Sequence, residues 1–248
     1  DTDIDPFNCG RCGNVCPTGL CNGGVCRGAR SGHVAAIGHD YSTAAPSSAA
    51  GKVVANGVFL PSANPVRVLV LDQYADATAE TSVGKILDST ATITGRTWKK
   101  TVAATSADVL TKLSIDAFEV LLVLDQPKAP AGALATIGDD LKAKVTSFNE
   151  TGGVVVVLDG GGGIGEMPAF LSASGLLATS GHTSISGKTV DVIAPADAIG
   201  IDVLTPYLAG NKSVTFTLTT APSPTIVVVV EEPTSSGPVV IHRVVRKP

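Results

Sequence analysis

The sequence predicts an α/β fold in which helices cover both faces of a mostly parallel sheet, with a small cysteine-rich module in front of it. Short apolar runs alternate with longer stretches of helical character along most of the 248 residues, a pattern typical of strands that alternate with helices. Two runs, at 118–124 and 154–158, are apolar at nearly every position, which indicates strands buried on both faces. All five cysteines lie between Cys9 and Cys26.

The first five apolar runs are expected to form the parallel strands. Pro65 marks the beginning of the second run, because proline is tolerated at the first residue of a strand. The third run, which begins at Trp98, is the weakest of the five signals. The runs span residues 34–37, 66–71, 98–103, 118–124 and 154–158.

Five helices are expected between and after these strands. The longest repeats apolar residues at three- and four-residue spacing from Leu134 to Phe148, and Gly152 and Gly153 follow as a C-cap. Ser106 is the expected N-cap of the third helix, and Pro168 suits the first turn of the last. The helices span residues 49–59, 79–89, 107–113, 132–149 and 168–177.

Beyond Ser180 the pattern becomes rich in strand formers. Only residues 199–208 have helical character there. The turn at 235–238 joins the last two strands, which predicts an antiparallel extension at one edge of the sheet. The expected β segments are 184–193, 213–219, 225–231 and 239–245.

The cysteines define a separate module, residues 1–27, in front of a domain at 33–248. A stretch this short cannot hold one structure by a buried core alone and needs disulfide bonds or a metal ion. Because disulfides persist in oxidising compartments, we expect a secreted or cell-surface protein. Five cysteines form at most two internal bridges, which leaves one to pair elsewhere. Zinc is the alternative, although only the first pair has C-x-x-C spacing. The cysteines are Cys9, Cys12, Cys16, Cys21 and Cys26.

Composition narrows the classes of partner. Hydrophobic residues make up 44% of the chain and charged residues 16%, which is typical of a folded core. A formal net charge of −4 does not favour nucleic acid or an anionic membrane as partner, and no apolar run is long enough for a membrane span. The chain opens on Asp1 without a leader, which we interpret as removal or omission of a signal peptide.

Four predicted strands are followed by an aspartate: Asp40, Asp72, Asp125 and Asp159. Ligands of open parallel sheets bind beyond the carboxyl ends of the strands, so these carboxylates are a candidate metal site for Ca²⁺ or Mg²⁺. Three neighbours in the sequence, His39, Gln73 and Gln126, are further candidates. In the alternative interpretation, each aspartate caps its own loop or helix.

The segment from Asp125 through the long helix to 151–158 resembles the core of class I glutamine amidotransferase-like domains, in which a helix ending in Gly-Gly leads to a buried strand near the active site. The resemblance implies a three-layer, flavodoxin-like sheet. Catalytic members have a Gly-x-Cys-x-Gly elbow after a strand, whereas Asp159 is followed here by Gly160–Gly163. Glutaminase or peptidase chemistry is therefore not implied.

The first 26 residues resemble cysteine-rich modules of secreted myxobacterial proteins. The segment from Asp5 to Cys16 carries the resemblance. In those modules a further cysteine commonly precedes the Asp-Thr dipeptide, here Asp1-Thr2. The resemblance implies that the chain starts partway into the module, which accounts for the odd number of cysteines.

Other motifs give little support to an enzyme. Gly160-x-Gly162-x-x-Gly165 matches a dinucleotide fingerprint, but it comes late in the chain and no acidic residue stands about 20 positions later. No Gly-x-Ser-x-Gly elbow occurs. Asp159 and His182 are the catalytic candidates, the latter beside three hydroxyl residues, although a histidine in a surface loop is the more common case. His242 is expected on the polar face of the last strand.

These observations predict a non-catalytic extracellular protein, a pseudo-enzyme with a structural or binding role. The alternatives are a secreted hydrolase or amidotransferase-like enzyme with a carboxylate site, and a sugar- or peptide-binding module. We also expect a homo-oligomer or polymer, in a filament or matrix. The unpaired cysteine and the strands at 226–230 and 239–245, which we expect to be exposed at a sheet edge, would mediate it.

Overall fold

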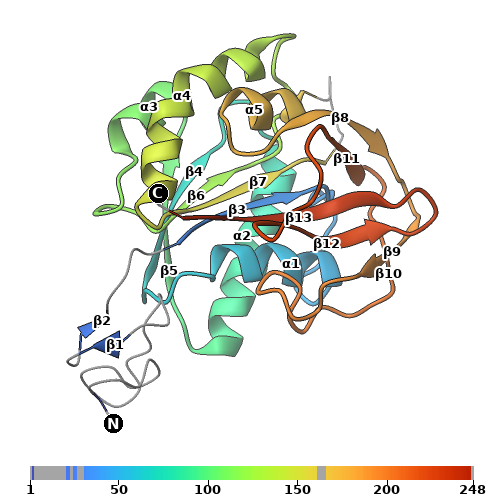
Figure 1. The fold of residues 1–248 in the computed structure, drawn as a ribbon, viewed down its shortest axis with the longest axis horizontal. Helices are drawn as coiled ribbons and strands as arrows, with labels where there is room; N and C mark the ends of the chain where they lie inside the picture. The colour runs from blue at the N-terminus through green and yellow to red at the C-terminus, as the bar shows by residue number, and fades with distance from the viewer. Residues whose placement is uncertain (1, 3–20, 23–24, 27–30, 161–165, 247–248) are drawn as a thin grey trace.

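The computed structural model describes residues 2, 21–22, 25–26, 31–160 and 166–246 (Figure 1). Most of the predicted cysteine module lies outside these residues, so its disulfides and the zinc alternative stay predictions. Within it, Cys21–Asn22 (β1) pairs antiparallel with Val25–Cys26 (β2). None of the helices in the described ranges has the length and hydrophobicity that a membrane span requires.

A nine-stranded sheet forms the centre of the domain, in the order β10-β9-β12-β13-β3-β7-β6-β4-β5. Five neighbouring strands of this sheet are parallel to one another, namely β3, β7, β6, β4 and β5. This confirms the predicted α/β class with a mostly parallel sheet. The parallel strands are β3 (Gly32–Ile37), β4 (Val66–Leu71), β5 (Trp98–Ala103), β6 (Val120–Val123) and β7 (Val154–Leu158).

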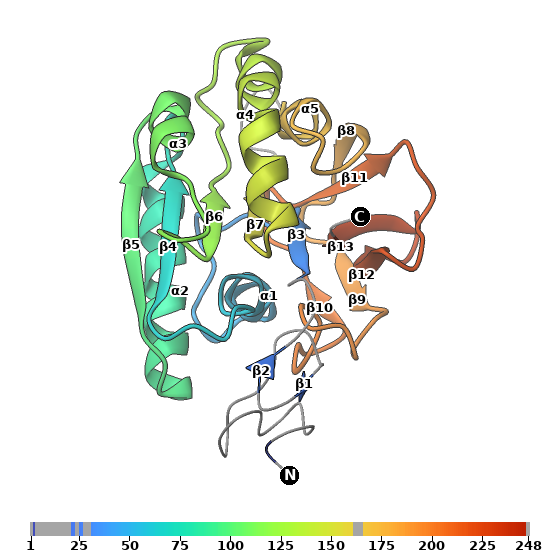
Figure 2. The same cartoon turned by 60° about the vertical axis from the view of Figure 1, so that its left-hand side comes forward.

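Helices cover both faces of the sheet (Figure 2). Connections that run toward β5 pass through α1 (Ala49–Val58) and α2 (Ala77–Thr94) on one face. Connections that run back pass through α3 (Ser106–Lys112) and α4 (Ala133–Glu150) on the other face, where α5 (Met167–Ala173) also packs. Right-handed crossovers require this change of face. The arrangement is compatible with a three-layer fold.

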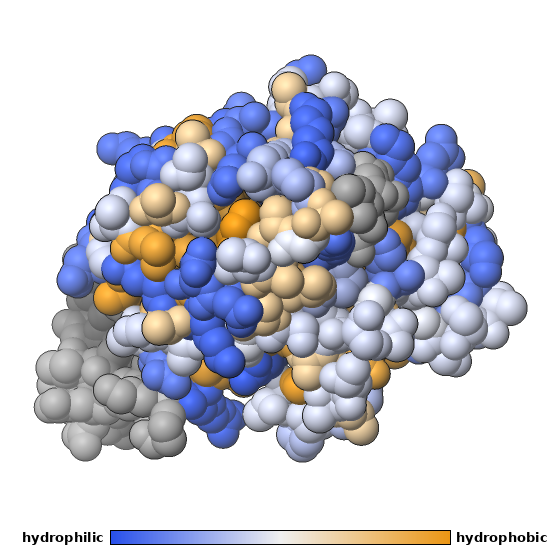
Figure 3. Space-filling model, turned by 90° about the horizontal axis from the view of Figure 1, so that it is seen from above, coloured by the Kyte–Doolittle hydropathy of each residue, from blue (hydrophilic) through white to orange (hydrophobic). Residues whose placement is uncertain are grey.

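Side chains of each strand alternate between the two hydrophobic layers. In β4, Val68 and Val70 pack on the side of α1 and α2, whereas Leu69 and Leu71 pack on the side of α4. The buried residues of α4 follow the predicted stripe from Leu134 to Phe148. Its exposed residues are mostly hydrophilic, and Figure 3, which views this side of the molecule, shows blue hydrophilic side chains mixed with white and orange ones.

The predicted antiparallel extension is confirmed next to β3. The long β13 (Gly237–Val245) pairs antiparallel with β3 and with β12 (Ile226–Glu232). Two shorter strands continue the sheet, β9 (Thr189–Val192) and β10 (Tyr207–Leu208). A separate two-stranded sheet, which the sequence did not predict, pairs β8 (Thr179–Ser184) with β11 (Val214–Leu218).

The predicted helix at 199–208 is wrong. The chain there forms turns and then β10, and Asp202 adopts a left-handed conformation with φ of 56°, which interrupts a helix. The Asn56 side chain on α1 donates hydrogen bonds to the carbonyl oxygens of Ile199 and Ile201, both at 2.9 Å. These carbonyls are therefore satisfied from another element instead of by a local helix.

The prediction of an exposed sheet edge is also wrong for residues 239–245. In the described part of the sheet, β13 lies between β12 and β3, whereas β12 pairs with β9 only at Val230 and Glu231. The outer strands are β5 and β10. Lys99 and Lys100 are exposed on β5, and lysines on an edge strand oppose pairing with another sheet. Thr105, not Ser106, is the N-cap of α3, where it forms a capping box with Asp108.

Replacing Gly138 with alanine should destabilise the domain because α4 and α5 touch there. A Cβ atom at Gly138 would lie 2.8 Å from the Phe170 carbonyl oxygen and 3.0 Å from the Ser174 nitrogen. We expect a loss of about 1–3 kcal/mol in the free energy of unfolding, measured by urea denaturation. Gly84→Ala is the matched control, because nothing lies within 4 Å of its Cβ position, and it should gain up to about 1 kcal/mol. Equal effects at both positions would contradict this view of the helix contact.

Candidate functional site

Three of the four predicted aspartates lie together at the carboxyl ends of β3, β6 and β7, which are neighbours in the sheet. A Cβ atom built on Gly160 would lie 3.0 Å from Oδ2 of Asp125 and 3.6 Å from Cα of Asp40, and Asp159 directly precedes this glycine. The fourth, Asp72, follows β4 and lies among other charges. Its pKa is raised first by burial and then by Glu80.

Asp159 and His182 form a hydrogen-bonded ion pair. Oδ2 of Asp159 lies 2.6 Å from Nδ1 of His182. Asp159 is 1% exposed, and its backbone N–H donates to the Ile37 carbonyl oxygen at 2.9 Å, which fixes the end of β7 against β3. His182 comes from β8, where it stands opposite Phe216 of β11. Both residues are catalytic candidates from the sequence, far apart in the chain, and the structure brings them together.

This pair raises the pKa of His182. The hydrogen bond to Asp159 is the main cause, burial of the ring opposes it, and the negative charges of Asp159 and Asp125 add to the increase. An imidazolium is stabilised by a nearby carboxylate. Nδ1 therefore donates its proton to Asp159, which orients the ring.

Asp125 completes what we call the acid–base cluster, namely Asp125, Asp159 and His182. Burial and then the charge of Asp159 raise the pKa of Asp125 from 3.8 to about 7, against the opposing hydrogen bond from the Gly160 N–H. A carboxyl group whose pKa is raised by burial and by a neighbouring charge is typical of functional sites.

A cleft with a volume of about 470 Å³ opens beside the cluster, lined by Asp40, Asp76, Asp125, Lys128 and Lys212 among others. Two of these aspartates also have local roles, which the alternative interpretation predicted for Asp40 but did not consider for Asp76. Oδ1 of Asp40 accepts the Ser42 N–H at 2.8 Å, and Asp76 caps α2. We call this cavity the strand-end cleft.

The further candidates from the sequence have structural roles. Oε1 of Gln126 accepts the Tyr74 N–H at 2.7 Å, and its Nε2 donates to the Leu124 carbonyl oxygen at 2.7 Å. Gln73 accepts the Ser106 N–H. Nε2 of His39 lies 2.7 Å from the Tyr207 hydroxyl, and burial lowers the pKa of His39 to about 4.

The predicted Ca²⁺ or Mg²⁺ site gains no support from this geometry. Among the residues that the structure describes, no group of three or more histidine, cysteine, aspartate or glutamate side chains is placed to hold a metal ion. Asp72 is apart from the other three aspartates, and Asp159 is hydrogen-bonded to His182.

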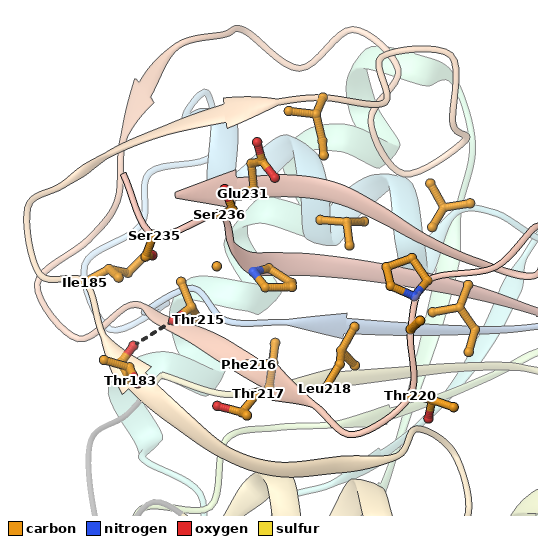
Figure 4. Close-up of a pocket in the computed structure, with 18 of the residues that line it drawn as sticks. Thr183, Ile185, Thr215, Phe216, Thr217, Leu218, Thr220, Glu231, Ser235 and Ser236 are labelled. Carbon is orange, nitrogen blue, oxygen red and sulfur yellow. Dashed lines mark hydrogen bonds between the residues drawn. The ribbon is translucent and has the colours of Figure 1, made fainter. Parts of the chain in front are cut away.

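A larger groove lies between the β8–β11 pair and the β12–β13 hairpin (Figure 4). Its volume is about 930 Å³, and hydroxyl groups and apolar side chains line it, including Thr183, Thr215, Leu218 and Ser235. The Thr215 hydroxyl donates to the Thr183 carbonyl oxygen at 3.4 Å. We place the candidate functional site at the acid–base cluster instead, because size alone does not indicate chemistry and the perturbed ionisable groups lie there.

Comparison with known proteins assigns no family. No family model, no curated protein and no solved structure matches this chain. The resemblance to amidotransferase-like domains therefore stays a prediction. Residues 161–165 of the glycine-rich turn, which also contain most of the dinucleotide-like motif, lie outside the described residues.

Proposed function

We propose that this chain is a non-catalytic extracellular binding protein, whose strand-end cleft takes up a small polar ligand next to the acid–base cluster. One observation carries the proposal. The structure joins three ionisable groups in a crevice, yet in the described part of the chain no hydroxyl or thiol is hydrogen-bonded to His182, whose Nδ1 binds Asp159. A histidine in nucleophilic catalysis takes a proton from such a hydroxyl or thiol while its other nitrogen binds a carboxylate.

The pairing of His182 supports a role in binding. In the described part of the chain, its ring is hydrogen-bonded to Asp159 and to no serine, threonine or cysteine. Asp159 stands after β7, in the turn where the amidotransferase resemblance leads one to expect the nucleophile elbow. A carboxylate there stabilises the imidazolium and leaves no thiol for it to activate.

The charges around the strand-end cleft define the class of ligand. Asp40 and Asp125 offer acceptors for a basic group, and Lys128 and Lys212 offer partners for an anionic group. A small molecule that carries an amine, alone or with a carboxylate, matches this distribution. Binding should require the ionised form of Asp125, so affinity should rise with pH around 7.

Strand order and cysteine usage support the wider proposal. Flavodoxin-like sheets have the strand order 2-1-3-4-5. If β4 is taken as the first strand, the neighbouring strands β5, β4, β6 and β7 have the order 2-1-3-4, and β3 lies where the fifth strand would be. Ligands of such sheets bind at the carboxyl ends of the strands, where the acid–base cluster lies. The cysteine-rich N-terminal segment supports secretion.

A hydrolytic enzyme is the second candidate, favoured by the pKa of Asp125. A carboxyl group with a pKa of about 7 can donate a proton to a leaving group near neutral pH. The neutral form of His182, oriented by Asp159, would then accept a proton from water. This scheme needs no nucleophilic side chain.

Binding and turnover assays with the same variants separate the two candidates. Ligand-observed NMR with a mixture of amines and amino acids should show binding to the wild type that is lost in Asp125→Asn and kept in Asp139→Asn, a change on the exposed side of α4. Fluorogenic esters, amides and glycosides should not be hydrolysed. Hydrolysis abolished by Asp159→Asn would overturn the binding proposal in favour of the enzyme, and neither binding nor hydrolysis would overturn both.

A further inference from the structure

A second group of ionisable side chains lies far from the strand-end cleft. Nδ1 of His242 is 2.8 Å from Oδ2 of Asp197, and Nε2 of His242 is 2.9 Å from Nδ1 of His33. The two imidazole rings stack with centroids 5.2 Å apart. We call these three side chains the Asp197–His242–His33 chain. It joins β13, β3 and the loop after β9.

His242 is not on a polar, solvent-facing surface, so that prediction is wrong. It is 3% exposed, because the loop at residues 193–206 covers this face of β13. Ile199 and Val203 from this loop pack into the hydrophobic layer that also contains Val240. Alternation along β13 places His242 on the same face as Val240, which puts it under the loop.

The hydrogen bonds dictate how many protons the chain can hold. An ionised carboxylate only accepts, so Nδ1 of His242 carries a proton and donates it to Asp197. When His242 is neutral, its Nε2 accepts the proton on Nδ1 of His33. One additional proton can be bound by either ring without loss of the hydrogen bond between the rings, because the neutral ring can take the tautomer in which its facing nitrogen accepts or donates as required. With two additional protons, both facing nitrogens carry hydrogen across 2.9 Å, and two imidazolium charges repel.

Charges nearby do not relieve this repulsion. Asp197 is the carboxylate that acts on both histidines. Burial raises its pKa, but the hydrogen bonds from His242 and the Ile199 N–H and the nearby histidines together outweigh burial, so the pKa is lowered overall. From α1, Lys52 pairs with Asp202 of the same loop at 4.0 Å. The neighbouring Arg243 donates instead to the carbonyl oxygens of Gly175 and Leu176. Burial and then the charge of His242 lower the pKa of His33 to about 4.

We propose that the Asp197–His242–His33 chain is a pH-operated latch, which holds loop 193–206 over the sheet at neutral pH and releases it in acid. Asp197 is the point of attachment, because its Oδ1 also accepts the Ile199 N–H at 2.8 Å. The second attachment, from Asn56 to Ile199 and Ile201, does not titrate. Acid therefore weakens the Asp197 end of the loop, next to Ile199.

The direction of the effect follows from proton binding. In the closed state His33 takes up a proton only near pH 4, whereas in the open state it is free to do so near its ordinary value of 6.5. The open state thus binds about one more proton between these values, and the opening equilibrium should rise about tenfold per pH unit of acidification. Above pH 6.5 the opening equilibrium should not depend on this group.

Hydrogen exchange of loop 193–206 between pH 7 and pH 4 tests the latch. Protection factors, corrected for intrinsic exchange, should fall with decreasing pH in the loop before they fall in β4. His33→Gln keeps a donor toward His242 without a charge, so the loop should stay protected to lower pH. Asp197→Asn should open the loop already at pH 7.

Lys52→Gln is the matched control, because it removes the other ionic contact of the loop and leaves the histidines in place. It should retain the pH dependence of the wild type. Equal loop protection at pH 7 and pH 4 in the wild type would overturn the proposal. So would an unchanged pH dependence in His33→Gln, provided that this variant shows native protection in β4 at pH 7.

Discussion

Replacing Asp159 with alanine should destabilise the domain by about 1–3 kcal/mol, because the change removes a buried hydrogen-bond partner and leaves Nδ1 of His182 without its acceptor. Asp159 is 1% exposed, and its partner His182 lies 2.6 Å away. The free energy of unfolding, measured by urea denaturation at pH 7, is the test. Asp139→Ala on the exposed face of α4 is the matched control and should stay within about 0.5 kcal/mol of the wild type.

The same loss of charge should lower two pKa values. His182 loses the negative charge on its hydrogen-bond acceptor, so its pKa should fall. Asp125 loses a repelling neighbour and should fall below about 7, although burial, the larger cause, remains. NMR titration of the conservative variant Asp159→Asn measures both. Unchanged titration of His182 and Asp125 would show that the three side chains do not form one cluster.

Replacing Asp125 with asparagine should have the opposite effect on stability, a gain of up to about 4 kcal/mol at pH 8. The folded protein raises the pKa of Asp125 from 3.8 to about 7, so folding retains a proton that the unfolded chain has lost. Stability is therefore lost as pH rises from 3.8 through 7, and the difference between these values corresponds to about 4 kcal/mol. Asparagine has no charge to bury and keeps an oxygen that can accept the Gly160 N–H.

Denaturation at pH 5 and pH 8 gives this prediction its control. At pH 5 most of Asp125 is protonated in the folded state, so the gain from asparagine should be smaller than at pH 8. A variant less stable than the wild type at pH 8, or a gain independent of pH, would contradict the proposed ionisation of Asp125. Together with the loss in Asp159→Ala, a gain here would mark the two carboxylates as having opposite roles.

Much of the fold follows from local hydrophobic patterns. The bounds of β4, β5 and β7 agree with the runs in the sequence, and α4 lies within one residue of its prediction. These patterns are informative because a buried strand or an amphipathic helix must present its apolar residues at a fixed spacing. Local patterns do not determine the segment at 199–208, because the Asn56 side chain and the turn at Asp202 decide its backbone conformation.

The sequence by itself determined that carboxylates would gather beyond the strand ends, because aspartates follow parallel strands. Only the tertiary structure decided which of these carboxylates lie close together and which histidines form hydrogen bonds with them. His182 reaches Asp159 through a two-stranded sheet outside the main one, and His33 meets His242 across 209 residues of sequence. Periodicity is a local property that assigns a side chain to a face. A hydrogen bond between distant side chains depends on strand register and on the loop packed above, which no short segment encodes.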